Sequence, residues 1–243
     1  MQENIKLKQI YEAIKTNNVQ FFGSIPTLKT KEKEKEKEKE KEKEKEKENF
    51  LHFAFKQNSS KEIIELLISK GVDINSKNKW NETPLNIALQ NKNPKEIIEL
   101  LIEKGVDINS KNQWNEIPLH IALKNKNPKE IIELLISERC ADINSKNQWN
   151  EIPLHIALKN KYPKEIIELL IEKGSDINSK NQWNEIPLHI ALKNKNSNEI
   201  IELLIEKGSD LNLKNKWNES SLHIALRNKY SKEIIELLIS KRF

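Results

Sequence analysis

Tryptophan recurs at a nearly constant interval along this chain of 243 residues, and the period constrains the fold more than any other feature. Successive tryptophans are 34, 35, 34 and 34 residues apart, at Trp80, Trp114, Trp149, Trp183 and Trp217. A leucine recurs in step with them at Leu51, Leu85, Leu119, Leu154, Leu188 and Leu222. Periods of this length are typical of proteins in which each unit completes the hydrophobic core of its neighbours. The period therefore predicts six copies of one unit in place of a single large core.

Each unit contains the patterns of two short helices, which are clearest in residues 80–113. Pro84 suits the first position of a helix, and the apolar residues after it continue for about two turns. A second helix is expected to begin near Asn93, whose side chain is expected to cap its amides. The aliphatic residues Ile97–Ile102 form a stripe wide enough for two contacts, and Gly105 supplies a left-handed stop. Helices this short are marginal alone, so each unit needs a neighbour on both sides.

The order of these motifs resembles the ankyrin repeat family, whose signature is Thr-Pro-Leu-His-x-Ala in units of about 33 residues. The matching segment here is Thr83–Ala88, followed by Ile97–Ile102 and then by Gly105–Asn109. Equivalent segments recur over roughly residues 50–243. The resemblance implies an all-α fold, an ankyrin-type solenoid of stacked helix-turn-helix units joined by short hairpin loops.

The sequence departs from the family pattern at three places. The threonine before the proline is replaced by Ile117, Ile152 and Ile186, which removes a capping hydroxyl worth about 1 kcal/mol in each copy. The family's turn glycine is replaced by Asn81, Asn115, Asn150, Asn184 and Asn218, and asparagine tolerates positive φ better than other side chains. In the third unit the helix stop contains no glycine and one extra residue, which predicts a distorted helix end or a bulged hairpin near Cys140.

Composition divides the chain into three regions. Residues 1–26 have the apolar pattern of a degenerate helix pair, which is expected to cap one end of the stack. Residues 27–49 form a low-complexity linker with nine Lys-Glu pairs between Lys31 and Glu48. This run has no net charge and no apolar face, so we interpret it as a solvated linker or a frayed helix and not as a binding tail. Residues 50–243 hold about six repeats, of which the last is truncated.

Neither a membrane segment nor a secretory signal is expected from the sequence. The longest apolar runs are much shorter than a bilayer span, and the N-terminal residues do not form a continuous apolar core. The single Cys140 cannot form an internal disulfide. These features favour an intracellular location, cytoplasmic or nuclear, and we expect a monomer.

The residue types that perform catalysis or bind metals recur once per unit and do not converge on one place. The histidines share one register, His52, His120, His155, His189 and His223, and the aspartates share another, Asp73, Asp107, Asp142, Asp176 and Asp210. A catalytic site needs different groups that meet, and stacked units hold equivalent residues about 10 Å apart, too far to share a zinc ion. We therefore expect no enzyme activity, no cofactor and no metal. The resemblance implies structural histidines that hydrogen-bond within and between repeats, and we interpret Cys140 as a packing or loop residue.

Tryptophan stands at the expected hairpin turn, outside both helix stripes. The resemblance implies that this turn is an exposed tip with which ankyrin proteins meet partners, and tryptophan is enriched among interface hot spots. The alternative is that each tryptophan packs on the neighbouring hairpin and stiffens the array. The candidate partner-binding residues are Trp80, Trp114, Trp149, Trp183, Trp217, Gln113, Gln148, Gln182, Lys124, Lys159, Lys193 and Arg227. Beside them run Glu82, Glu116, Glu151, Glu185 and Glu219.

The predicted function is a non-catalytic scaffold that binds another protein through its hairpin tips and concave inner-helix face. The net charge of +5 and the basic inner stripe favour an acidic partner, and near-identical units favour an elongated or repetitive one. A first alternative is a binder of nucleic acid or another polyanion, because basic groups interleaved with aromatics can follow a strand. The glutamate row disfavours nucleic acid. A second alternative is a substrate-recruiting subunit of a larger enzyme complex.

Overall fold

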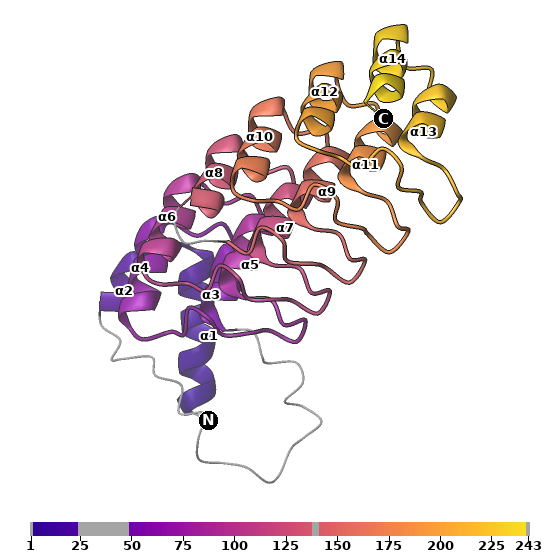
Figure 1. Cartoon of the computed structure of the whole chain (residues 1–243). Helices are drawn as coiled ribbons and strands as arrows, with labels where there is room; N and C mark the ends of the chain where they lie inside the picture. The colour runs from indigo at the N-terminus through magenta and orange to yellow at the C-terminus, as the bar shows by residue number, and fades with distance from the viewer. Residues whose placement is uncertain (1, 24–48, 138–140, 242–243) are drawn as a thin grey trace. The chain divides into compact units, whose positions relative to one another are not determined.

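The computed structural model describes residues 2–23, 49–137 and 141–241, and all regular secondary structure in these ranges is helical (Figure 1). The chain divides into two compact units, residues 1–113 and residues 114–243. The Lys-Glu run and Cys140 lie outside the described residues, so the predicted linker and the predicted distortion near Cys140 stay predictions. The boundaries of the predicted regions at residues 26 and 49 stay predictions as well.

Unit 1 contains an N-terminal helix pair and two further pairs of the repeating type. Its helices are α1 (Gln2–Lys15), α2 (Val19–Gly23), α3 (Phe50–Lys56), α4 (Lys61–Ser69), α5 (Pro84–Gln90) and α6 (Lys95–Glu103). Helix α1 packs on α3, and α2 packs on α4. Ile14 and Phe22 are fully buried, and the ring of Tyr11 contacts the rings of Phe50 and Phe53. The N-terminal pair therefore covers the apolar side of the first repeating pair.

Unit 2 contains four helix pairs of the repeating type. Its helices are α7 (Pro118–Lys124), α8 (Lys129–Ser137), α9 (Pro153–Lys159), α10 (Lys164–Glu172), α11 (Pro187–Lys193), α12 (Asn198–Glu206), α13 (Ser221–Arg227) and α14 (Lys232–Ser240). The first helices of the pairs form an inner row in which each packs on the next, and the second helices form an outer row (Figure 1). Hairpin loops project beside the inner row (Figure 1). This repeated packing of helix pairs confirms the all-α, ankyrin-type fold predicted from the sequence.

The inner helices lie in the core, because apolar residues on all sides of these helices are buried. In α9, Leu154, Ala157 and Leu158 are fully buried, and Ile156 is almost so. In α10, Ile166, Ile167 and Leu170 are fully buried, while Lys164 and Glu168 form an exposed ion pair of 3.5 Å on the outer side. Each buried aliphatic side chain stabilises the stack by about 1.5–3 kcal/mol. Because these residues recur in every repeat, the core is continuous within each of the two compact units.

Residues at positive φ end the helices and shape the hairpins. Gly105 ends α6 with φ of 86°, and Gly174 ends α10 with φ of 90°, as the left-handed stop requires. At the hairpin tips, Asn81, Asn115, Asn150, Asn184 and Asn218 have φ between 56° and 62°. The prediction that asparagine replaces the family's turn glycine at positive φ is confirmed.

The start of the second helix differs from the prediction. Helix α6 begins at Lys95 with Pro94 as its N-cap. Asn93 is buried, and its Nδ2 donates to the carbonyls of Ala88 at 3.3 Å and Phe55 at 3.4 Å. The predicted capping role of Asn93 is therefore wrong. Its side chain instead hydrogen-bonds to carbonyl groups near the ends of α3 and α5, which have no partner within their own helices.

Candidate partner-binding surface

An asparagine two residues before the tryptophan organises each hairpin. Oδ1 of Asn147 accepts hydrogen bonds from the backbone N–H groups of Trp149 and Glu151, both at 2.9 Å. The Asn147 N–H donates to the Glu151 carbonyl at 3.1 Å, which closes the loop. The same bonds form around Asn78, Asn181 and Asn215. The sequence interpretation missed this residue, although its constant spacing from tryptophan was a usable signal.

A glutamate ties each described hairpin to the inner helix that follows it, and it is buried in all of these hairpins except the last. Oε1 of Glu151 accepts from Nζ of Lys159 at 3.3 Å, and Oε2 accepts from Nδ2 of Asn147 at 3.1 Å. The side chain of Glu151 is 4% exposed, whereas that of Lys159 is 54% exposed. Equivalent pairs are Glu116–Lys124 at 2.9 Å, Glu185–Lys193 at 2.9 Å, Glu219–Arg227, and Gln90 donating to Glu82 at 2.7 Å. The basic stripe thus lies over a row of glutamates that is covered and not openly acidic.

The tryptophans are divided between packing and exposure. Trp80 in unit 1 is 37% exposed and Trp217 in unit 2 is 56% exposed, while Trp114, Trp149 and Trp183 are half-buried. Nζ of Lys124 lies 5.9 Å from the ring centroid of Trp114 and 5.8 Å from that of Trp149. A lysine between two indoles forms cation–π contacts with both. The rings therefore support the hairpins and still present part of their surface to solvent.

Backbone hydrogen bonds connect successive hairpins within each unit. In unit 2 the N–H groups of Gln148 and Gln182 donate to the carbonyls of Trp114 and Trp149, both at 2.8 Å, and Lys216 donates to Trp183 at 3.0 Å. In unit 1, Gln113 donates to Trp80 at 3.0 Å. The side chains of Gln113 and Gln148 are exposed and that of Gln182 is half-buried. The glutamine register therefore fixes the step between hairpins and also places amides at the surface.

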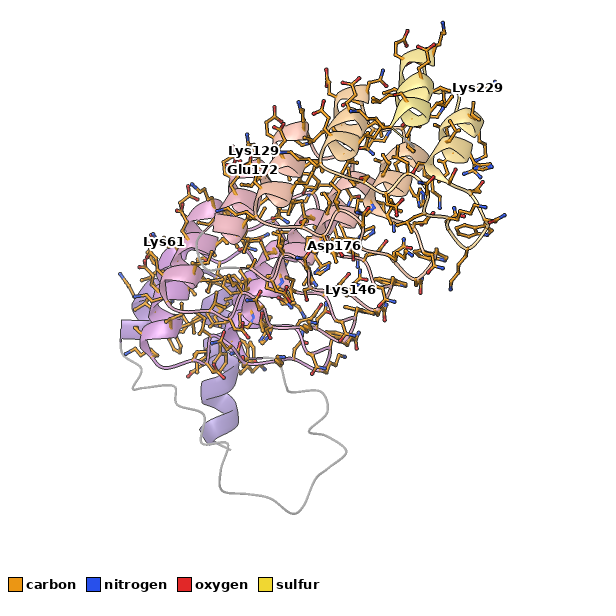
Figure 2. All side chains as sticks on the ribbon, viewed as in Figure 1. Lys61, Lys129, Lys146, Glu172, Asp176 and Lys229 are labelled. Atoms are coloured by element: carbon orange, nitrogen blue, oxygen red, sulfur yellow. The ribbon has the colours of Figure 1, made fainter. Side chains whose placement is uncertain are left out.

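These contacts surround a groove in unit 2. It has a volume of about 290 Å³ and is lined by Trp149, Trp183, Ile156, Asn160 and the two ion pairs of Glu116 with Lys124 and Glu151 with Lys159. The structure thus brings together two of the predicted tryptophans and two of the predicted lysines. Lys193 and Arg227 occupy the equivalent positions of the next two inner helices. Figure 2 labels Lys129, which belongs to the outer row of helices in the same unit.

Three histidines, His52, His120 and His155, bridge adjacent repeats. Nδ1 of His155 accepts from the Ile152 N–H at 3.2 Å, so the ring holds the amide that begins its helix. Its Nε2–H donates to the Glu185 carbonyl of the next hairpin at 3.2 Å. His120 reaches Glu151 and His52 reaches Glu82 in the same way, at 3.0 and 2.8 Å. These are the structural hydrogen bonds that the family resemblance implied.

Burial keeps the rings of His155 and His189 neutral. Removal from water lowers the pKa of His155 to about 4, and the same cause lowers the pKa of His189 to about 4. For His155, a neutral ring is also the only form that accepts at Nδ1 while it donates at Nε2. The isoleucine N-caps Ile117, Ile152 and Ile186 therefore receive from histidine part of the support that a hydroxyl gives elsewhere.

Among the described side chains, no three His, Cys, Asp or Glu residues gather closely enough to hold a metal ion. Within the same part of the chain, no helix combines the length and the apolar character that crossing a bilayer requires.

Stacked helix pairs with hairpins on one side define a solenoid repeat protein. The family described as Ankyrin repeats (3 copies) matches residues 13–112, 90–181 and 154–243, so the chain belongs to the ankyrin repeat family. Repeats of this family generally mediate protein–protein interaction and are typically not enzymes. A comparison with curated proteins found no match.

Proposed function

We propose that this chain is a non-catalytic scaffold that binds another protein through its hairpin tips and the concave face of its inner helices. The observation that carries the proposal is the repeated, partly exposed tryptophan, which stands in every described hairpin beside a half-exposed basic residue or glutamine. Large rigid aromatic side chains next to cations are the residues most often found at interface hot spots.

We also propose that the scaffold acts as an intracellular monomer, cytoplasmic or nuclear, on a partner that is acidic or elongated. The single Cys140 supports a reducing compartment. The half-exposed ammonium groups of Lys124, Lys159 and Lys193 support an acidic partner. A substrate-recruiting subunit of a larger enzyme complex would use the same surface.

Capture of partners from native cell extract tests the proposal. The tagged chain is compared with a variant in which Trp114, Trp149 and Trp183 are changed to Ala, and circular dichroism establishes that both are helical. Loss of the captured proteins from the folded variant is the expected result. The matched control changes Lys129, Lys164 and Lys232 to Ala, because these residues form exposed ion pairs on the outer helices. Partners that are retained by the tryptophan variant and lost from the control would contradict the proposed surface.

A polyanion is the second candidate, favoured by the burial of the glutamates. Because their carboxylates lie under the lysines, the accessible side of each ion pair is cationic. Binding that weakens steeply with salt and is unaffected by removal of the tryptophans would support a polyanion, since phosphate contacts release counterions.

A further inference from the structure

The groove of unit 2 has the size and lining of a site for side chains. Its volume of about 290 Å³ lies between the indoles of Trp149 and Trp183, with Ile156 as an apolar lining residue. This volume lies at the lower limit of about 300 Å³ for small-molecule pockets, and it is large enough for one or two side chains of a longer segment. Indole walls and an isoleucine favour an apolar side chain between them.

Two ammonium groups supply the charge of the same groove. Lys124 and Lys159 are 51% and 54% exposed, whereas the carboxylates that they contact are 4% exposed. Each ammonium has three N–H donors, and the glutamate uses one side of it. An approaching group therefore meets positive charge, and the complementary group is a carboxylate.

The residues that line the groove belong to positions that recur once in each repeat. Its elements recur in the next repeat, where Lys193 lies over Trp217 at 5.4 Å and pairs with the covered Glu185. Hydrogen bonds from each hairpin to the one before hold these elements in register. Neighbouring packed helices are about 8–10 Å apart. Three residues of a polyproline II helix span about 9 Å and place every third side chain on the same side. A β-strand does not match this spacing, because the side chains of residues i and i+3 point to opposite faces of the strand.

We propose that this face of unit 2 binds an acidic partner segment in polyproline II conformation, with apolar side chains at every third position and carboxylates between them. Each apolar side chain enters one groove between neighbouring indoles, and each carboxylate contacts a lysine at the end of an inner helix. The inference rests on the proposed function and adds the conformation, the spacing and the charge of the partner segment.

Selection from random 12-residue peptides displayed on phage tests the proposal with the full chain as bait. The enriched peptides are expected to contain an excess of Asp and Glu and to repeat apolar residues at positions i, i+3 and i+6. One enriched peptide is then labelled, and its affinity is measured by fluorescence anisotropy. Trp149→Ala and Trp183→Ala are each expected to weaken binding at least about tenfold, as hot-spot truncations do.

A second variant tests the charge without leaving an unpaired carboxylate. The double change of Lys124→Met with Glu116→Gln removes both members of a pair and is expected to weaken the acidic peptide several-fold. The matched control is Lys129→Met with Glu133→Gln, which removes an exposed pair on the outer helix α8 and should leave the affinity unchanged. Circular dichroism of all variants separates loss of binding from loss of the fold.

Three outcomes overturn the inference. They are enriched peptides without the three-residue recurrence, enriched peptides that are basic, and tighter Trp149-dependent binding of a 12-nucleotide oligothymidine. Peptides that need Trp149 but lack the recurrence would remove the inference and leave the proposed function in place. The proposed function itself fails only in the capture experiment with the triple tryptophan variant.

Discussion

Five lysines hold a backbone conformation that glycine adopts without steric conflict. Lys92, Lys126, Lys161, Lys195 and Lys229 have φ between 53° and 57°. Each follows the C-cap of an inner helix, where the chain turns sharply toward the outer helix. In this left-handed region a Cβ approaches the following carbonyl, at a cost of about 1–2 kcal/mol. The lysines therefore store strain in five of the six repeating pairs, and Asn58 holds the equivalent position after α3.

Replacement of Lys161 by Gly is expected to stabilise the protein. The relief of strain exceeds the greater chain entropy of glycine, so the free energy of unfolding should rise by about 0.5–1 kcal/mol. Urea denaturation followed by circular dichroism measures the change. The control is Lys173→Gly, at a C-cap with φ of −80°, which should destabilise. Equal losses for the two variants would show that Lys161 is not strained.

Tyr162 stands where several other repeats have asparagine, and it reaches across to the preceding repeat of unit 2. Its hydroxyl lies 3.3 Å from the Ala122 carbonyl and 3.2 Å from the Asn127 carbonyl, and burial raises its pKa to about 12. Tyr162→Phe should lower the free energy of unfolding by about 1 kcal/mol, because a buried hydrogen bond is lost without a change of shape. Tyr230→Phe serves as the comparison and should cost less, since its bonds are 3.4 Å and it is half-buried. Identical effects of the two changes would argue against the role of burial.

At the scale of the helix pair, the histidines make stability depend on pH. The pKa of His155 and that of His189 are about 4 in the folded chain, below the value of about 6.5 in an unfolded one. Between these values the unfolded chain binds more protons, so the folded state loses stability as pH falls from 6.5 toward 4. Above pH 6.5 this contribution is fully present. Each histidine changes the free energy of unfolding by at most about 1.4 kcal/mol per pH unit.

Urea denaturation at pH values from 7 to 5 measures this slope. His155→Asn with His189→Asn should flatten it, and asparagine already occupies the same register at Asn86. Lys129→Ala, which removes an exposed ion pair, should keep the slope of the unchanged protein. An unchanged slope in the double histidine variant would mean that other groups cause the pH dependence.

The helix pairs were predictable from the sequence because their signals are local. Proline at the first helical position, a wide aliphatic stripe and glycine at the stop each act within one turn, and they placed α5 and α6 close to their observed bounds. The role of Asn93 was mispredicted because its partners lie in α3 and α5, and one sequence window does not contain both. The contact of Lys124 with Glu116 was missed for the same reason, since it joins a hairpin to a helix. The position of a residue within a helix depends on the nearby sequence, whereas its hydrogen-bond partner depends on how separate elements pack.

At the scale of the whole molecule, the free energy of unfolding should increase with the number of repeats. A second copy of residues 149–182, inserted after Gln182, supplies a hairpin, two helices and both matching faces. Because each repeat contacts its neighbours alone, the free energy of unfolding and its dependence on urea should both increase. A flexible Gly-Ser insert of equal length at the same point is the control and should increase neither. If the added repeat left the urea dependence unchanged, the new unit would not have joined the stack.

The three ion pairs with a covered carboxylate, those of Glu116, Glu151 and Glu185, also bear on how the protein responds to heat. The hydration free energy of charged groups becomes less favourable as temperature rises, so the penalty for burying a carboxylate under a lysine decreases. The stabilisation gained from aliphatic burial reaches a plateau over the same range. Warming should therefore shift the balance of stability within a repeat away from the aliphatic helices and toward the base of the hairpin, where Glu151 meets Lys159.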